Sequence, residues 1–148
     1  MRTLTRENLI DILYGCAILG TGGGGSLEDG IRLIDEALAQ GKRFRLATFA
    51  DLADTDIIGT PYGCGAISPL TEAERQKYAR LPEASENFYV LCMKQLEQYL
   101  GQELKAVVST ELGGHNTATA LYCGAMGDKL ILDADPAGRS VPGLQHST

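Results

Sequence analysis

Apolar residues recur at helical spacing in the first forty positions of the chain. Five of them fall at i, i+3, i+4, i+7 and i+8: Leu9, Ile12, Leu13, Cys16 and Ala17. Thr5 stands ahead of this run in the position of an N-cap. A second helical run follows Ser26 and is ended by Gly41. The pattern predicts helices over about 5–19 and 27–40.

Four short apolar runs farther along the chain predict strands. They cover about 44–47, 56–59, 103–110 and 129–133. Between them the spacing predicts a polar helix from Thr71 that Pro82 ends, a helix over about 85–100, and one of small residues over 117–126. Strands that alternate with helices imply an α/β fold. We expect a sheet of about four or more strands with helices on its faces, and a glycine-rich loop between the first two helices.

Length and charge narrow the class of protein. A chain of 148 residues with 44% hydrophobic content buries one core of ordinary size, so we expect a single α/β domain over 1–148. The net charge of −6 speaks against nucleic acid or an anionic membrane as partner, because either needs a basic face. The chain shows no signal peptide and no apolar run long enough to span a bilayer. These observations predict a cytoplasmic protein with a small-molecule partner.

The four cysteines form no C-x-x-C pair, which argues against a zinc ribbon or a thioredoxin-type motif. Cys16 and Cys92 fall on apolar helical faces, where we expect buried thiols. Cys64 lies between two glycines in a turn after a predicted strand. Its thiol is therefore a candidate for exposure and for contact with a substrate, although no basic neighbour lowers its pKa.

Five of the six residues from Gly20 to Gly25 are glycines, which lets the backbone approach a ligand closely. With Ser26 as N-cap of the next helix, the loop would present amides at the positive end of a helix dipole, a site suited to anions and carbonyl oxygens. The same residues satisfy G-x-G-x-x-G, but a helix precedes them and Phe44 and Arg45 stand where a dinucleotide site needs an acid. A flexible connector is the remaining alternative.

Polar residues follow the later predicted strands, where ligands gather in α/β sheets. Those that would converge are Glu111, His115, Asn116, Asp133, Asp135 and Arg139. Asp133, Asp135 and His115 offer mixed oxygen and nitrogen ligands for a divalent metal. Alternatively, Asp133 caps turn amides, Asp135 pairs with Arg139, His115 serves in capping or in the core, and Asn116 is a plain N-cap.

Three blocks, residues 15–25, 111–116 and 133–142, resemble in order and approximate spacing the DUF917 family, also called the S-methyl thiohydantoin desulfurase family. Members of that family are often encoded beside hydantoinase/oxoprolinase proteins. The resemblance implies an α/β N-terminal domain that is followed, in the usual member, by a mainly β C-terminal region. Residues 1–148 lack such a region, so we expect a fragment or a minimal version.

The resemblance further implies hydrolase-like attack on a five-membered cyclic amide ring of the hydantoin type, with loss of a thiol or ring opening. In our hypothesis Glu111, Asp133, Asp135 and Arg139 are catalytic, with Glu111 or Asp133 as general base and Arg139 holding the substrate. The substrate-binding residues are Gly22, Gly23, Gly24 and Gly25, whose amides hold an oxyanion, with Asn116 and Cys64. A metal on His115, Asp133 and Asp135 would replace the base.

A different hypothesis makes the chain a noncatalytic small-molecule-binding or assembly domain that partners a hydantoinase-type protein. A nucleotide-binding domain is disfavoured, because no G-K-[ST] follows the glycines. An apolar helix face that a missing domain leaves uncovered would favour self-association, so we expect a homo-oligomer or association with that domain.

Overall fold

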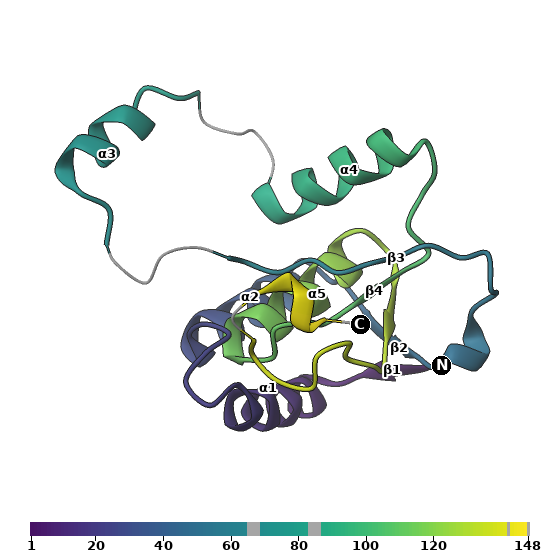
Figure 1. The fold of residues 1–148 in the computed structure, drawn as a ribbon. Coiled ribbons are helices and arrows are strands. Elements are labelled where there is room, and N and C mark those ends of the chain that lie inside the picture. The colour runs from purple at the N-terminus through teal and green to yellow at the C-terminus, as the bar shows by residue number, and fades with distance from the viewer. Residues whose placement is uncertain (65–68, 83–86, 142, 148) are drawn as a thin grey trace.

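The computed structural model describes residues 1–64, 69–82, 87–141 and 143–147. Its centre is a mixed sheet with strand order β1-β2-β5-β4-β3 (Figure 1). The strands are β1 (Arg2–Leu4), β2 (Phe44–Ala47), β3 (Ile58–Gly59), β4 (Ala106–Val108) and β5 (Leu130–Leu132). Strands β2, β5, β4 and β3 run parallel, and β1 pairs antiparallel with β2. The predicted α/β class is confirmed.

The four predicted strands are present, and three of them are shorter than expected. The apolar pattern did not predict β1, because three residues are too few to show alternation. The strand exists through its pairing with β2, where Thr3 faces Arg45. Sheet pairing therefore determines strand length here more than the length of each apolar run does.

Five α-helices and two 3₁₀ turns connect the strands in the described part of the chain. They are α1 (Arg6–Gly20), α2 (Leu27–Ala39), η1 (Phe49–Asp51), α3 (Glu72–Tyr78), α4 (Phe88–Leu100), α5 (Gly114–Met126) and η2 (Leu144–His146). The glycine-rich loop lies between α1 and α2, as predicted. Residues 85–86 of the predicted fourth helix fall outside the described residues. The last helix begins at Gly114 and not at Thr117, one turn earlier than predicted.

Side-chain caps begin the first two helices where the sequence placed them. Thr5 accepts a hydrogen bond from the amide of Asn8, whose side chain accepts one from the Thr5 amide in return. Ser26 accepts one from the amide of Asp29. Both helices therefore begin at the residues their sequence specifies.

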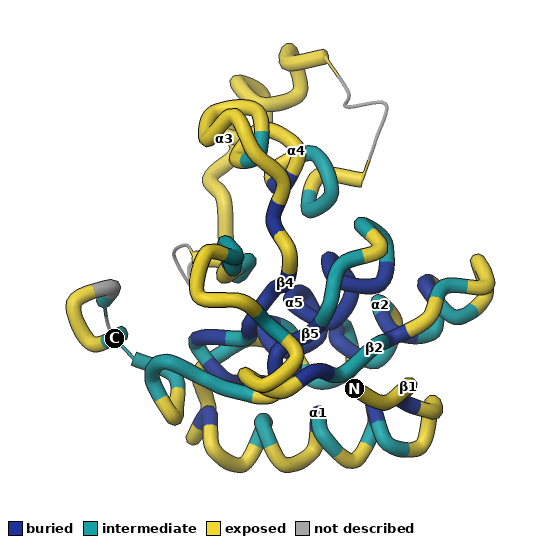
Figure 2. Tube along the Cα trace, turned by 90° about the vertical axis from the view of Figure 1, so that its right-hand side faces the viewer, coloured by how far each residue is buried: buried dark blue, intermediate teal, exposed yellow. Residues whose placement is uncertain are grey.

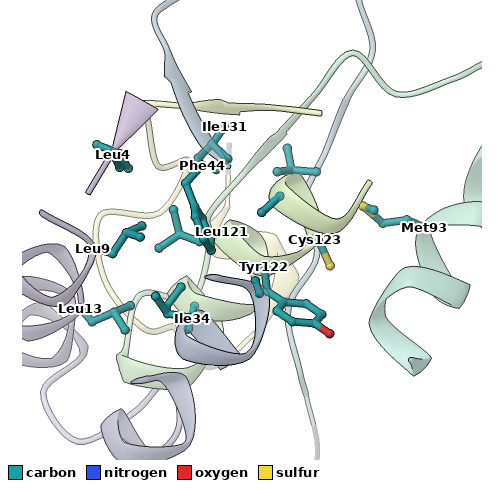
Figure 3. Packing of buried hydrophobic residues seen from close by; sticks show 14 residues of the cluster. Leu4, Leu9, Leu13, Ile34, Phe44, Met93, Leu121, Tyr122, Cys123 and Ile131 are labelled. Atoms are coloured by element: carbon teal, nitrogen blue, oxygen red, sulfur yellow. The ribbon is translucent and has the colours of Figure 1, made fainter. Parts of the chain in front are cut away.

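Helix α5 is the central helix of the domain. It packs on β2, β4 and β5, while α2 packs along α5, and α1 contacts both helices (Figure 1). At the contact with the sheet, a Cβ on Gly124 would lie 3.0 Å from the side chain of Val107, so the helix backbone comes close to the strands. Phe44, Leu121 and Ile131 fill the layer between helix and sheet (Figure 3).

Helices α3 and α4 belong to a long excursion between β3 and β4 that lies outside this layer (Figures 1 and 2). The expectation that Cys92 is buried is wrong: Cys92 is exposed, and Met93 is the one fully buried residue of its helix. Cys16 is partly buried and Cys64 is exposed. Cys123 is buried on α5, where burial raises the pKa of its thiol to about 12.

In the part of the chain that the structure describes, no helix has both the length and the apolar composition needed to cross a bilayer.

Candidate functional site

The carboxyl ends of the parallel strands lie at one edge of the sheet, as the sequence predicted. Val108 pairs with Leu132 at the ends of β4 and β5. Glu111 and Asp135 each follow their strand end by three residues. The register therefore brings two carboxylates to corresponding positions on neighbouring strands, at the edge where α/β proteins bind ligands.

The glycine loop packs against the first turn of α5. The carbonyl oxygen of Gly24 accepts hydrogen bonds from the amides of His115, at 3.1 Å, and Asn116, at 2.9 Å. A Cβ on Gly20 would lie 2.6 Å from the carbonyl oxygen of Leu112. The glycines thus permit a backbone-to-backbone contact that side chains would prevent.

This contact assigns part of the loop a structural task that the sequence did not predict. The loop uses a carbonyl to cap α5, and the amide of Gly23 donates to the carbonyl of Gly20 at 2.9 Å. The Gly23 amide is therefore engaged within the loop. The binding role of the amides of Gly22, Gly24 and Gly25 stays a prediction.

Glu111 fastens a later segment of the chain to this edge. Its backbone is left-handed, with φ of +56°, a conformation that costs a non-glycine residue energy. Its carboxylate accepts hydrogen bonds from the hydroxyl of Ser140 and the amide of Val141, both at 3.0 Å. Ser140 also packs on the loop, where a Cβ on Gly23 would lie 2.8 Å from the Ser140 Cβ. Glu111 therefore joins the loop after β4 to the loop after β5.

Asp135 uses only one of its two carboxylate oxygens. Oδ1 accepts a hydrogen bond from the Ala137 amide at 3.1 Å, whereas Oδ2 is buried and has no hydrogen-bond partner among the described residues. Arg139 does not pair with it as predicted: its side chain is exposed, and Nε donates to the Ser140 carbonyl at 2.9 Å. A buried acceptor without a donor is unfavourable, so Oδ2 of Asp135 is an acceptor for which the described residues supply no hydrogen bond.

The thiol of Cys16 lies near Asp135. Burial is the largest cause that raises the pKa of the Cys16 thiol; a hydrogen bond with Thr117 opposes the shift, and the charge of Asp135 adds to it. The Thr117 hydroxyl accepts bonds from the Ser109 hydroxyl at 3.3 Å and the Gly113 amide at 3.4 Å. These residues come from α1, α5 and the end of β4, so three elements meet at this part of the edge.

The three candidate metal ligands are not brought together. Asp133 is exposed, and its amide donates to the Ala47 carbonyl at 2.8 Å, which extends β5 beside β2. His115 Nε2 lies 3.1 Å from the hydroxyl of Tyr89 on α4. Within residues 1–64, 69–82, 87–141 and 143–147, no three His, Cys, Asp or Glu side chains are placed to hold a metal ion.

Asn116 has a positioning role instead of the predicted N-cap, which is Gly113. Its side-chain oxygen accepts from the Gly63 amide at 2.9 Å, and its nitrogen donates to the Gly63 carbonyl at 3.2 Å. The amide therefore fixes the loop after β3 to α5. Cys64, the next residue along this loop, is exposed.

Sequence patterns did not single out Tyr62 or Ser140. Burial raises the pKa of Tyr62, and the charges of Cys64 and Glu111 add to the shift, so its hydroxyl lies near the edge. The ring also borders a mostly apolar cavity of about 220 Å³ between α4 and the end of β3. The G-R-S-V run after β5 was the available signal for Ser140, but its partner Glu111 lies 29 residues away.

Comparisons with known proteins agree with this fold. The family model described as S-Me-THD-like, N-terminal domain, matches residues 7–148. The X-ray structure of a protein from Chromobacterium violaceum is similar, with a TM-score of 0.65 and 23% sequence identity over 97% of this chain. The chain spans 37% of the length of that protein. A search of curated proteins found no match.

Proposed function

The chain belongs to the S-Me-THD-like family, whose N-terminal domain it matches, and we propose that it binds and hydrolyses a hydantoin- or thiohydantoin-type cyclic amide. The observation that carries this proposal is the carboxylate of Asp135 at the carboxyl edge of the sheet, of which only Oδ1 accepts a hydrogen bond from the described residues. Hydrolysis of such a ring needs a group that takes a proton from water, and a carboxylate whose second oxygen accepts no hydrogen bond from the described residues is suited to that task.

In the proposed reaction, the oxygen of water forms a bond to a ring carbon, and Asp135 takes the proton that water loses. The tetrahedral intermediate carries negative charge on a ring nitrogen when sulfur leaves, or on the former carbonyl oxygen when the ring opens. The amides of Gly22, Gly24 and Gly25 would stabilise that charge. The bond from that carbon to sulfur, or to a ring nitrogen, then breaks. The leaving thiolate or amide takes the proton back from Asp135, so that no further reactant is needed.

Glu111 takes another role than predicted in this proposal, whereas Arg139 keeps its predicted role of holding the substrate. Glu111 is a positioning residue, because its two oxygens already hold Ser140 and Val141. Arg139 is exposed at the end of the turn that contains Asp135, and it would contact the polar edge of the substrate. The positions of His115, Asp133 and Asp135 do not fit a three-ligand site, so we route no step through a metal.

A second candidate function is that of a noncatalytic binding or assembly domain. The chain matches 37% of the Chromobacterium violaceum protein, so groups needed for turnover would come from another domain or from a hydantoinase-type subunit. Apolar side chains exposed on the outer face of α1 favour a partner there, either that domain or a second copy of the chain: Tyr14, Ile18 and Leu19.

Turnover assays separate these candidates. The purified chain is incubated with S-methyl thiohydantoin and with hydantoin, and thiol release and ring opening are followed. We expect Asp135→Asn to lower kcat/KM about 100-fold or more, since it removes a general base. Asp54→Asn makes the same chemical change in an exposed loop and is the matched control. Binding without turnover would favour the assembly domain, and the absence of both would contradict the proposal.

A further inference from the structure

The mostly apolar cavity of about 220 Å³ between α4 and the end of β3 takes no part in the hydrolysis proposed above. Met93 and Leu104 in its lining are buried, at 5% and 2% exposure, whereas Cys92 and Leu96 are exposed. The cavity therefore has a buried inner wall and a side that is open to solvent, through which a ligand group can enter.

Size and chemistry limit what this cavity can hold. None of the described residues that line it is charged, and the rings of Pro61 and Tyr62 add to its apolar surface. An ionised group would lose its hydration there without gaining a charged partner. Apolar cavities of about 150 Å³ already bind benzene, so this larger cavity has room for a phenyl ring or a branched aliphatic group. The occupant that fits is an uncharged apolar group of that size.

Hydrogen bonds connect the wall of the cavity to the glycine loop. Tyr62 lines the cavity, and the next residue, Gly63, exchanges two hydrogen bonds with the side chain of Asn116, at 2.9 and 3.2 Å. The backbone amide of Asn116 in turn donates to the carbonyl of Gly24 at 2.9 Å. A single residue of α5 therefore links the glycine loop to the loop that borders the cavity.

Tyr62 also connects the cavity to the carboxyl edge of the sheet. Burial raises the pKa of its hydroxyl, and the charges of Cys64 and Glu111 add to the shift. Charges more than about 10 Å apart are largely screened in solution, so the Tyr62 hydroxyl and the Glu111 carboxylate lie close to each other. The cavity and the edge are therefore adjacent, with Tyr62 and Gly63 between them.

We propose that this cavity binds the substituent at carbon 5 of the substrate ring, the ring atom that carries side groups in hydantoins, while the ring lies at the carboxyl edge. This inference rests on the proposed function and specifies its substrate class as rings with an aromatic or branched aliphatic group. Such a group leaves water when it enters the cavity, and the gain grows with the apolar area that is buried. A charged substituent gains nothing, because the described lining offers it no partner.

The first test measures binding of hydantoin, 5-isopropylhydantoin, 5-benzylhydantoin and 5-(carboxymethyl)hydantoin to the full chain by isothermal titration calorimetry. We expect the benzyl compound to bind at least about 10-fold more tightly than hydantoin, with the isopropyl compound between them, because each buries more apolar area. The carboxymethyl compound should show no gain. Cys92→Phe places a ring in the cavity and should abolish the benzyl preference. Gln98→Phe, an exposed position of α4 outside the lining, should retain it.

A second measurement locates the substituent without any variant. Cys92 is exposed and lines the cavity, so iodoacetamide should modify its thiol in the free protein. Peptide mass spectrometry follows the rate of this modification. A saturating concentration of 5-benzylhydantoin should slow the reaction of Cys92, whereas a saturating concentration of hydantoin should leave its rate unchanged. This result decides the question even if Cys92→Phe fails to fold.

The outcomes distinguish this inference from the function on which it rests. If the four compounds bind equally, or if the benzyl preference survives in Cys92→Phe, the inference is wrong and the proposed function stands. The same holds if 5-benzylhydantoin binds and leaves the modification of Cys92 unchanged. If the folded wild-type chain binds none of the four compounds, both are wrong.

Discussion

Helices α4 and α5 have the same length, thirteen residues, and opposite surroundings. Eleven residues of α5 are buried, whereas along α4 only Met93 is (Figure 2). Phe88, Leu96 and Tyr99 of α4 are exposed, Tyr99 by 87%. Glycine, alanine and threonine let α5 lie close to its neighbours on every side, while the larger residues of α4 meet the body along one line. The candidate site is built on the helix whose position is most strongly determined.

The largest effect is expected where the backbones of α2 and α5 touch. A Cβ on Gly30 would overlap the carbonyl of Gly114, and neither backbone can move without disturbing the site. Gly30→Val should destabilise the protein by about 4 kcal/mol or more, at the upper end of single-residue effects. Gly15→Ala, in the interior of α1 with no atom near its Cβ, should instead stabilise by up to about 1 kcal/mol. Urea unfolding of both variants checks this prediction; equal stabilities would contradict the packing described.

A matched pair of leucines sharpens the comparison between the two helices. Leu121 on α5 is 3% exposed and Leu96 on α4 is 42% exposed. Leu121→Ala should cost about 3 kcal/mol, because it leaves a cavity between helix and sheet. Leu96→Ala should cost under about 1 kcal/mol. Thermal unfolding measures both, and a larger loss for Leu96 would mean that α4 is packed more firmly than its exposure indicates.

Lys129 joins α4 to the body through an ion pair of low exposure. Its Nζ lies 2.7 Å from Oε1 of Glu97, and the two side chains are 12% and 18% exposed. The same Glu97 oxygen accepts a bond from the Leu104 amide at 2.8 Å. Lys129→Met leaves a half-buried carboxylate without its cation and should cost about 2 kcal/mol. Lys105→Met, at an exposed position, is the control and should cost little. Hydrogen exchange should show faster opening of α4 than of α5.

Acid should weaken the same contact. Burial raises the pKa of Glu97, but the bonds from Lys129 and the Leu104 amide outweigh it, so the net pKa is below its usual value. A folded pKa below the unfolded one adds stability above the unfolded pKa, about 4.3, and this stability is lost as the pH falls through the folded value. We expect the protection of the α4 amides against hydrogen exchange, relative to their intrinsic exchange rates, to fall below about pH 4. If Glu97→Gln shows the same pH dependence, the cause lies elsewhere.

Local signals in the sequence predicted much of the fold and less of the site. The caps at Thr5 and Ser26 and the strand at 44–47 depend on neighbours in the chain, and they were predicted. The exposure of Cys92 was not, because helical spacing shows which face is apolar but not how much of it another element covers.

The site depends on contacts between distant residues, so its residue types could be predicted but not their partners. Glu111 was identified as a carboxylate at a strand end, yet its role follows from Ser140, 29 residues later. Asn116 was identified as a polar helix start, yet it holds Gly63, 53 residues earlier. Nothing local to either residue specifies such a partner.

The most direct test of the site is a ¹⁵N–¹H correlation spectrum of the chain titrated with hydantoin. We predict shifts of the amides around the carboxyl edge, at Gly23, Glu111, Ala137 and Val141, with the amides of α4 unchanged. Shifts confined to the cavity beside α4, or none at millimolar ligand, would contradict the assignment of this edge as the binding site.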